Sequence, residues 1–411
     1  MGIFVDLYFK RKNKLATTTE INKIDDVIVD KKTSNKKRMI IIFSIVLIGG
    51  LVATTLVINE RVYNGNLFDA DKQRIDLKVN RFEKTLFEIN NDNIDALAGK
   101  LEADFGTFNE VFATQIMQKG NLPDTQYYHE LLEFTHNNDM REAYDSVALL
   151  FADFSEIEEE LEFAFGQFSV DFPSYPMPEI TTFFGGFNYG VVTYDNNIAI
   201  GLENFLGKNS KYYGLLGDPE YLRFQKQKKF IVSNAAEVWI NEHFQQYIGG
   251  RDLLSQLIYK GKVIYCIDKM LPESAMEDKF RFSKAEMNWV KENEASIWQY
   301  IVHEDLLFSK NEQQFRTFIN YSPFAKGMPP EAPGRVGYYI GYRMVSEYMN
   351  NNEVDTENLM CLTDSRKFLK QSKYKPTKYN NVKATYNTAL VWLIGFLIIF
   401  VILMLYYKSK K

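Results

Sequence analysis

The sequence predicts an α+β protein, in which a mostly helical domain with a small antiparallel sheet is flanked by two transmembrane helices. Two uncharged apolar runs, residues 39–58 and 389–407, lie near the two ends of the chain. Between them, apolar side chains recur mainly three and four residues apart, which is the spacing of amphipathic helices. Within this helical region, residues 181–202 are instead rich in β-branched and aromatic side chains arranged in short runs, which indicates strands.

The two apolar runs and the charges beside them predict the topology. The first run has 20 residues and, at about 1.5 Å per residue, reaches about 30 Å, the thickness of a bilayer core. Residues 1–38 carry a net charge of +5 and residues 408–411 carry +3. Because basic segments stay on the cytoplasmic side, both tails are expected in the cytoplasm, and residues 59–388 on the opposite side of the membrane.

The first span is expected to be a retained anchor. The hydrophilic leader is long, and residues 57–59 offer no small-residue site for cleavage of a signal peptide. Gly49 and Ala53 form a pair of small residues four positions apart, which lets helices pack closely in a membrane. This pair predicts contact between the two spans or between two copies of the chain, and ordinary lipid-facing residues are the alternative.

The composition of the central domain excludes several classes of protein. The whole chain has a net charge of −5. Because the two tails contribute +5 and +3, residues 59–388 carry −13. Nucleic-acid binding relies on clustered Lys and Arg, so no nucleic-acid partner is expected, and the basic tails are expected to face the lipid bilayer. Cys266 and Cys361 allow at most one disulfide, which excludes a disulfide-stapled scaffold.

The domain is expected to begin with a strand and to continue as helices. Ile75, Leu77 and Val79 alternate with polar residues, as in a half-buried strand, and a helical pattern opens at residues 81–83. Residues 93–172 then show successive amphipathic helical patterns.

Strands are expected in the middle of the domain. Residues 181–187, 190–194 and 198–202 are three short β-like runs, and Asp-Asn-Asn at residues 195–197 predicts a turn between the last two. These runs predict the small antiparallel sheet. After Pro219 the helical period returns and persists to about residue 370.

The sequence carries few residues that could build a metal or catalytic site. It has four histidines, and His129 and His136 are expected at the surface. His303-Glu304 begins like the zinc-peptidase motif, but the second histidine should follow four residues after the first, and position 307 is leucine. Neither a Gly-x-Ser-x-Gly elbow nor a phosphate-binding loop occurs, so no cofactor is expected.

A glycine- and tyrosine-rich segment opens a helix late in the domain. Residues 333–342 contain glycines three and four residues apart, which favours close packing of this helix against a neighbour. Arg335, Tyr338, Tyr339 and Tyr342 have two interpretations, core packing or a partner-facing patch.

Several short segments occur in a consistent order over roughly residues 75–377. They are Asn80-Arg81-Phe82-Glu83, Asp171-Phe172-Pro173, residues 195–207, Asp252-Leu253-Leu254, Leu271-Pro272, Asn293-Glu294 and Pro333-Gly334-Arg335. This order resembles that of the GldB-like gliding-motility proteins.

GldB-like proteins are similar to a group of zinc peptidases, in which a helix after the small sheet carries two histidines four residues apart. The resemblance places this motif on residues 231–247, where Ala236 and Ile240 stand at the two histidine positions and Glu237 alone remains. Without paired imidazoles the zinc ion loses ligands, and a lone glutamate cannot activate water. The resemblance therefore implies an inactive peptidase-like fold with no catalytic residue, metal or cofactor.

The resemblance also implies a place of action. It suggests a structural or partner-binding component of gliding motility and the type IX secretion machinery, which contacts other envelope and membrane proteins and is a candidate for homo-oligomerisation. GldB-like proteins are typically lipoproteins, whereas this chain is expected to use two spans. Its basic ends suit the inner membrane, with the main domain in the periplasm.

Two other functions stay open at this point. The chain is alternatively a divergent metal-dependent hydrolase of the periplasm, which would need Glu237 or Glu203 to meet His243 and His303 in space. A third hypothesis is a membrane scaffold whose spans embed in a larger complex.

Overall fold

The computed structural model describes residues 75–118 and 124–376. Within these residues, no helix combines the length and the apolar character that a membrane crossing requires. Several predictions concern segments outside the described residues, namely the two spans at 39–58 and 389–407, the basic tails, and the Gly49–Ala53 pair.

The domain contains one four-stranded mixed sheet. Its strands are β1 (Val79–Arg81), β2 (Ile180–Phe183), β3 (Val191–Tyr194) and β4 (Asn197–Gly201), in the order β1-β2-β4-β3. Strand β2 is parallel to both β1 and β4, and only β3 and β4 are antiparallel. The predicted antiparallel arrangement of the three runs in residues 181–202 is therefore confirmed for β3 and β4 and wrong for β2, which pairs in parallel with β4 because β4 lies between β2 and β3.

The β3–β4 hairpin confirms the predicted turn. Tyr194 pairs with Asn197, and the two residues between them, Asp195 and Asn196, have φ values of 41° and 56°. Asp and Asn tolerate this left-handed region better than other side chains, and two successive positive φ values fit the right-handed twist of a tight hairpin.

Helices make up most of the rest of the domain, as predicted. Before the sheet is completed, the chain forms α2 (Phe82–Leu86), α3 (Ile94–Val111), the π-helical turn η1 (Phe112–Ile116), α4 (Thr125–His136), α5 (Asn138–Leu150) and α6 (Ser155–Asp171). After β4 it forms η2 (Leu202–Phe205), α7 (Lys211–Leu215), α8 (Glu220–Arg223), η3 (Lys228–Phe230), α9 (Ile231–Phe244), η4 (Gln245–Tyr247), α10 (Leu253–Met270), α11 (Met276–Phe280), α12 (Lys284–Glu292), α13 (Glu294–His303), α14 (Glu312–Ile319), α15 (Val336–Asn351), α16 (Thr356–Cys361) and α17 (Ser365–Ser372).

Several helices begin at a side chain that caps them. Ser283 and Glu286 form a reciprocal capping box at the start of α12. Such caps satisfy amide groups that have no partner within the helix, and each stabilises the helix start by roughly 1 kcal/mol. Single residues cap six further helices, namely Asp124 (α4), Asn137 (α5), Asp252 (α10), Asn311 (α14), Asp355 (α16) and Asp364 (α17).

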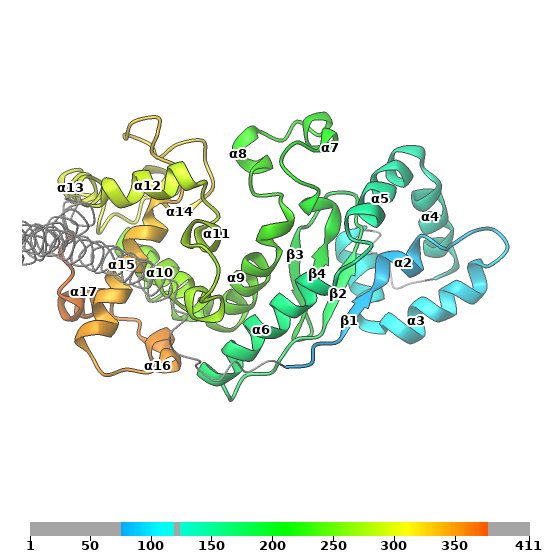
Figure 1. Ribbon diagram of the computed structural model, residues 1–411, viewed down its shortest axis with the longest axis horizontal. Helices are drawn as coiled ribbons and strands as arrows, with labels where there is room; N and C mark the ends of the chain where they lie inside the picture. The colour runs from blue at the N-terminus through cyan, green and yellow to red at the C-terminus, as the bar shows by residue number, and fades with distance from the viewer. Residues whose placement is uncertain (1–74, 119–123, 377–411) are drawn as a thin grey trace, which may run out of the picture. The chain divides into compact units, whose positions relative to one another are not determined.

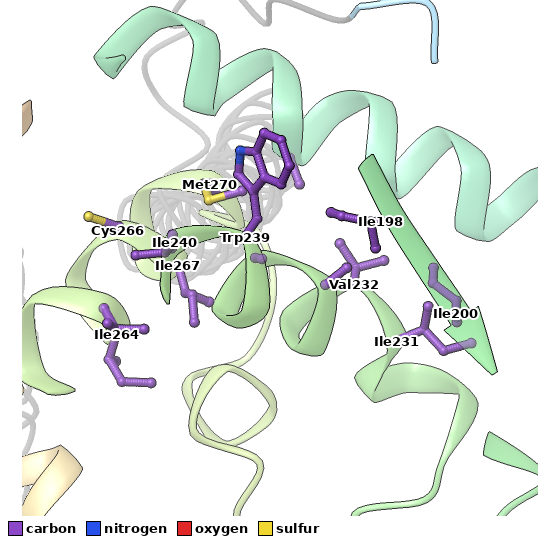
Figure 2. Packing of buried hydrophobic residues seen from close by; sticks show 14 of the residues in the cluster. Ile198, Ile200, Ile231, Val232, Trp239, Ile240, Ile264, Cys266, Ile267 and Met270 are labelled. Atoms are coloured by element: carbon purple, nitrogen blue, oxygen red, sulfur yellow. The ribbon is translucent and has the colours of Figure 1, made fainter. Parts of the chain in front are cut away.

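Helices cover both faces of the sheet (Figure 1). Helix α2 contacts β2, where aromatic side chains such as Phe82, Phe108 and Phe183 pack together. Helix α9 contacts β3 and β4. Figure 2 shows Ile231 and Val232 of α9 turned toward Ile198 and Ile200 of β4. This packing fixes α9, the helix on which the resemblance places the metal motif.

Helices α10 and α15 cross at a contact made by glycines, as the glycine spacing predicted. A Cβ built on Gly341 would lie 1.8 Å from the carbonyl oxygen of Leu257, and a Cβ on Gly261 would lie 2.1 Å from the carbonyl carbon of Gly341. Backbone atoms cannot yield as flexible side chains do. The two helices therefore approach so closely only because both positions lack a side chain.

We predict that Gly341→Ala destabilises the chain, because the added methyl group forces α15 away from α10. The expected loss is about 1–3 kcal/mol of unfolding free energy, measured by denaturant titration of the full chain. Gly99→Ala on α3 is the matched control, since a Cβ there meets nothing within 4 Å. That change should stabilise the chain by about 0.5–1 kcal/mol. Equal effects of the two substitutions would contradict the close crossing.

Candidate functional site

The two positions that the resemblance assigns to histidines are packed into the core. Ala236 and Ile240 on α9 are completely buried. Figure 2 shows Ile240 beside Ile264 and Ile267 of α10, in the apolar layer between the two helices. Neither side chain carries an atom that can ligate a metal ion. These positions therefore contribute to packing between α9 and α10.

Glu237 lies one residue further along α9, and basic and phenolic groups surround its carboxylate. Arg281 donates a hydrogen bond through Nη2 to Oε2. Arg335 Nη2 lies 3.2 Å from Oε2 and 3.5 Å from Oε1, and the Tyr338 hydroxyl donates to Oε1 over 3.1 Å. Glu237 is only 9% exposed, so these partners replace most of the water around its carboxylate. We call Glu237, Arg281, Arg335 and Tyr338 the Glu237 cluster.

A second layer of groups orients the two arginines. Arg281 Nη1 donates to Asn234 Oδ1 over 2.7 Å, and Arg335 Nη1 donates to the Tyr321 hydroxyl over 2.6 Å. The Arg335 guanidinium also lies 4.3 Å from the ring centre of Tyr321 and 3.9 Å from that of Tyr338. Such cation–π contacts are worth more when the cation is desolvated, as it is here.

Both arginines adopt a backbone conformation that is unusual for a residue with a side chain. Arg281, at the end of α11, has φ of 55°, and Arg335, just before α15, has φ of 63°. The left-handed region costs a non-glycine residue on the order of 1 kcal/mol. The ionic and stacking contacts of the Glu237 cluster offset this strain and direct both guanidinium groups to one carboxylate.

The Glu237 cluster contains more positive than negative charge. Two buried guanidinium groups face one carboxylate, and the Lys260 ammonium lies 5.6 Å from the Tyr338 ring centre. Burial alone would raise the pKa of Tyr338, but Arg335, Lys260 and Arg281 lower it from 10.0 to about 8. Ionisation of the Tyr338 hydroxyl would supply the missing negative charge.

The donor set around Glu237 does not fit a zinc ion. Positions 236 and 240 supply no ligand atom, and both carboxylate oxygens of Glu237 already accept hydrogen bonds from charged or phenolic donors. Across residues 75–118 and 124–376, no three His, Cys, Asp or Glu side chains form a group that could hold a metal ion.

The comparisons with known proteins identify the family. A family model described as "Gliding motility protein GldB" matches residues 66–376, which is most of the chain. The chain belongs to this GldB family. No curated protein and no solved structure shows a significant match to it.

The described part of this GldB-family chain does not assemble the groups that the hydrolase hypothesis needs. His243 packs against the Trp239 ring at 4.4 Å, and burial lowers its pKa below the ordinary value of 6.5. The His303 side chain is 86% exposed and pairs with Glu304. Glu237 and these two histidines do not belong to a common metal-binding group among the described residues.

Glu203, the other candidate of that hypothesis, has a local structural role. It is completely buried, and its Oε1 accepts hydrogen bonds from the amides of Gly185 at 2.7 Å and Phe187 at 3.1 Å. Burial raises the pKa of Glu203 from 4.5 to about 7. The carboxyl group therefore holds the loop after β2.

The four residues considered as a partner-facing patch lie mostly in the interior. Arg335 and Tyr338 belong to the Glu237 cluster, and Tyr339 is buried as well. Tyr342 is half-buried, and its hydroxyl donates to Asp268 over 2.8 Å. Arg335 and Tyr338 are therefore core residues, whereas Tyr339 and Tyr342 also line a pocket beside α12 and α13.

Sequence reasoning missed Arg281, Asn234 and Tyr321. Asn234 lies three residues before Glu237 on α9, so helical spacing could have suggested it. Arg281 and Tyr321 come from connections 44 and 84 residues away in the sequence, and no local pattern marks them.

We predict that Tyr338 ionises before the other buried tyrosines. Its pKa in the folded chain lies below the ordinary value, so ionisation stabilises the fold. This contribution is absent below about pH 8 and grows toward pH 10, to on the order of 2–3 kcal/mol. A titration of tyrosinate ultraviolet absorbance should show an early step with a midpoint near pH 8.

Tyr338→Phe should remove this early step. Tyr259→Phe is the matched control and should leave it in place, because burial raises the pKa of Tyr259 above its ordinary range. An early step that persists in Tyr338→Phe would contradict the charge balance inferred for the Glu237 cluster.

Proposed function

We propose that this GldB-family chain is a non-catalytic component of a gliding-motility machinery. In this proposal two spans hold it in the inner membrane, its main domain lies in the periplasm, and it binds other envelope proteins, including those of the type IX secretion system. Family membership supports the association with gliding, and the apolar runs with basic flanks support the anchoring.

One observation carries the non-catalytic part of the proposal. The carboxylate of Glu237 is held by two guanidinium groups and a hydroxyl, in the place where a zinc peptidase would need a base for water. A carboxylate whose two oxygens both accept hydrogen bonds from charged or phenolic donors is occupied by these contacts, so we infer that it does not act on a water molecule. The same contacts join separate segments of the fold, which is a structural use of the residue.

The proposal predicts how the chain behaves without the acid–base capacity of Glu237. In a strain that lacks the chain, Glu237→Gln should restore gliding to nearly the wild-type rate whenever its cellular level matches the wild type. Loss of an essential base would instead lower the rate by about 10²-fold or more. His243→Ala is a companion variant, because the hydrolase hypothesis uses the His243 side chain as a metal ligand.

Two further measurements keep this test decisive if Glu237→Gln accumulates poorly. The purified wild-type chain should contain less than stoichiometric zinc, and mild cross-linking in cells should recover it with other envelope proteins. Stoichiometric zinc that is lost in His243→Ala would favour the hydrolase. Recovery as a solitary monomer, with normal gliding in the deletion strain, would overturn the proposed role.

A further inference from the structure

A second candidate site shares no residue with the Glu237 cluster. A cavity of about 530 Å³ opens between the end of η1, helices α4 and α5, and the loop after β2. We call it the α4–α5 pocket. Its lining residues are Met117, Glu130, Glu133, Phe134, Asn137, Met140, Gly185, Gly186 and Asn188.

The loop that forms one wall of the α4–α5 pocket is fixed in a special conformation. Gly186 has φ of +72°, which favours glycine, and a Cβ there would lie 3.5 Å from the Phe134 ring. A Cβ on Gly185 would come within 2.6 Å of Ile116. Asn188 Nδ2 ties the loop by donating to the carbonyl oxygen of Gly185 over 3.2 Å. At Gly185 and Gly186 the wall is therefore backbone without side chains, and the Asn188 side chain holds it in place.

Glu203 behind this wall determines what kind of ligand the pocket can hold. Its carboxyl group accepts the amide hydrogens of Gly185 and Phe187. Loops of this kind often bind anions through such amides. Here the amides already have a partner, so they are not available to an anionic ligand.

The remaining groups of the pocket favour a positive charge on an apolar stem. Glu130 and Glu133 supply two carboxylates, of which that of Glu130 also accepts a hydrogen bond from Gln126, and none of the nine lining residues is Lys, Arg or His. The Phe134 ring can face a cation, and the thioethers of Met117 and Met140 adapt to an aliphatic chain. A guanidinium or ammonium group on a hydrocarbon stem matches this combination of charge and apolar surface.

We propose that the α4–α5 pocket receives a lysine or arginine side chain of a partner protein. The inference rests on the proposed partner-binding function and adds the chemistry of the contact. The π-helical turn η1 leads directly into Met117 at the pocket, and such turns are frequent at functional sites. Charge complementarity with an acidic domain adds long-range attraction for a basic partner.

The test uses the full-length chain in detergent, with ¹³C-methyl labels on its methionines. N-acetyl-arginine methylamide is the probe, and its citrulline counterpart is the neutral control of nearly the same shape. Addition of the arginine probe should shift the methyl signals of Met117 and Met140 to saturation, whereas the citrulline probe should bind at least about tenfold more weakly, the scale of one lost charged contact.

Two double variants separate the pocket from the overall charge of the domain. Glu130→Gln with Glu133→Gln should weaken arginine binding about tenfold or more, as expected for lost charge-assisted contacts. Glu158→Gln with Glu162→Gln on α6 removes the same charge elsewhere and should leave binding unchanged. Circular dichroism confirms that both variants are folded.

Equal binding of both probes, equal weakening by both double variants, or no saturable shift at Met117 and Met140 would overturn the proposal. These outcomes are distinct from failure of the proposed gliding role. The probe measurement needs no other component of the machinery, whereas the cellular tests do not depend on this pocket.

Discussion

A single buried carboxylate connects the second half of this domain. Glu237 on α9 binds Arg281 at the end of α11 and Arg335 at the start of α15, which lie 44 and 98 residues further along the chain. Its third partner, Tyr338, is the third residue of α15. Because α15 also crosses α10 at Gly261 and Gly341, and α9 packs on the sheet, Glu237 links the sheet to the α10–α15 helix pair. Removal of one partner from such a buried group is expected to cost about 3–5 kcal/mol, since the remaining charges stay buried without compensation.

This arrangement bears directly on the metal motif that the family resemblance assigns to α9. A zinc site needs several ligand atoms directed at one point and an open position for water. In this chain, the two positions assigned to histidines are apolar and face the α9–α10 layer, while the glutamate between them binds guanidinium groups. Glu237 on α9 therefore stabilises the fold. The proposed partner binding is instead assigned to the α4–α5 pocket, whose lining residues all lie in the first half of the domain.

The sequence predicted the local features and missed the distant ones. The turn at residues 195–197, the helical stretches on both sides of the sheet and the glycine contact of α15 follow from residue types within a few positions of one another. The parallel pairing of β2 with β1 and β4 depends on how segments up to 101 residues apart meet, as Val79 and Ile180 do. Arg281 and Tyr321 were missed for the same reason. The sequence left two interpretations of Tyr338 and Tyr339 open, because a tyrosine ring can pack in a core or lie at a surface. The structure shows both residues buried.

The central claim is that Glu237 acts as a structural ion-pair partner of the arginines. A double-mutant cycle with Glu237→Gln and Arg281→Met, read as unfolding free energy of the full chain, tests it most directly. We predict that each single substitution destabilises the chain by about 3 kcal/mol or more and that the coupling energy reaches about 2 kcal/mol or more. Additive effects within about 0.5 kcal/mol, the spread expected for independent sites, would contradict it.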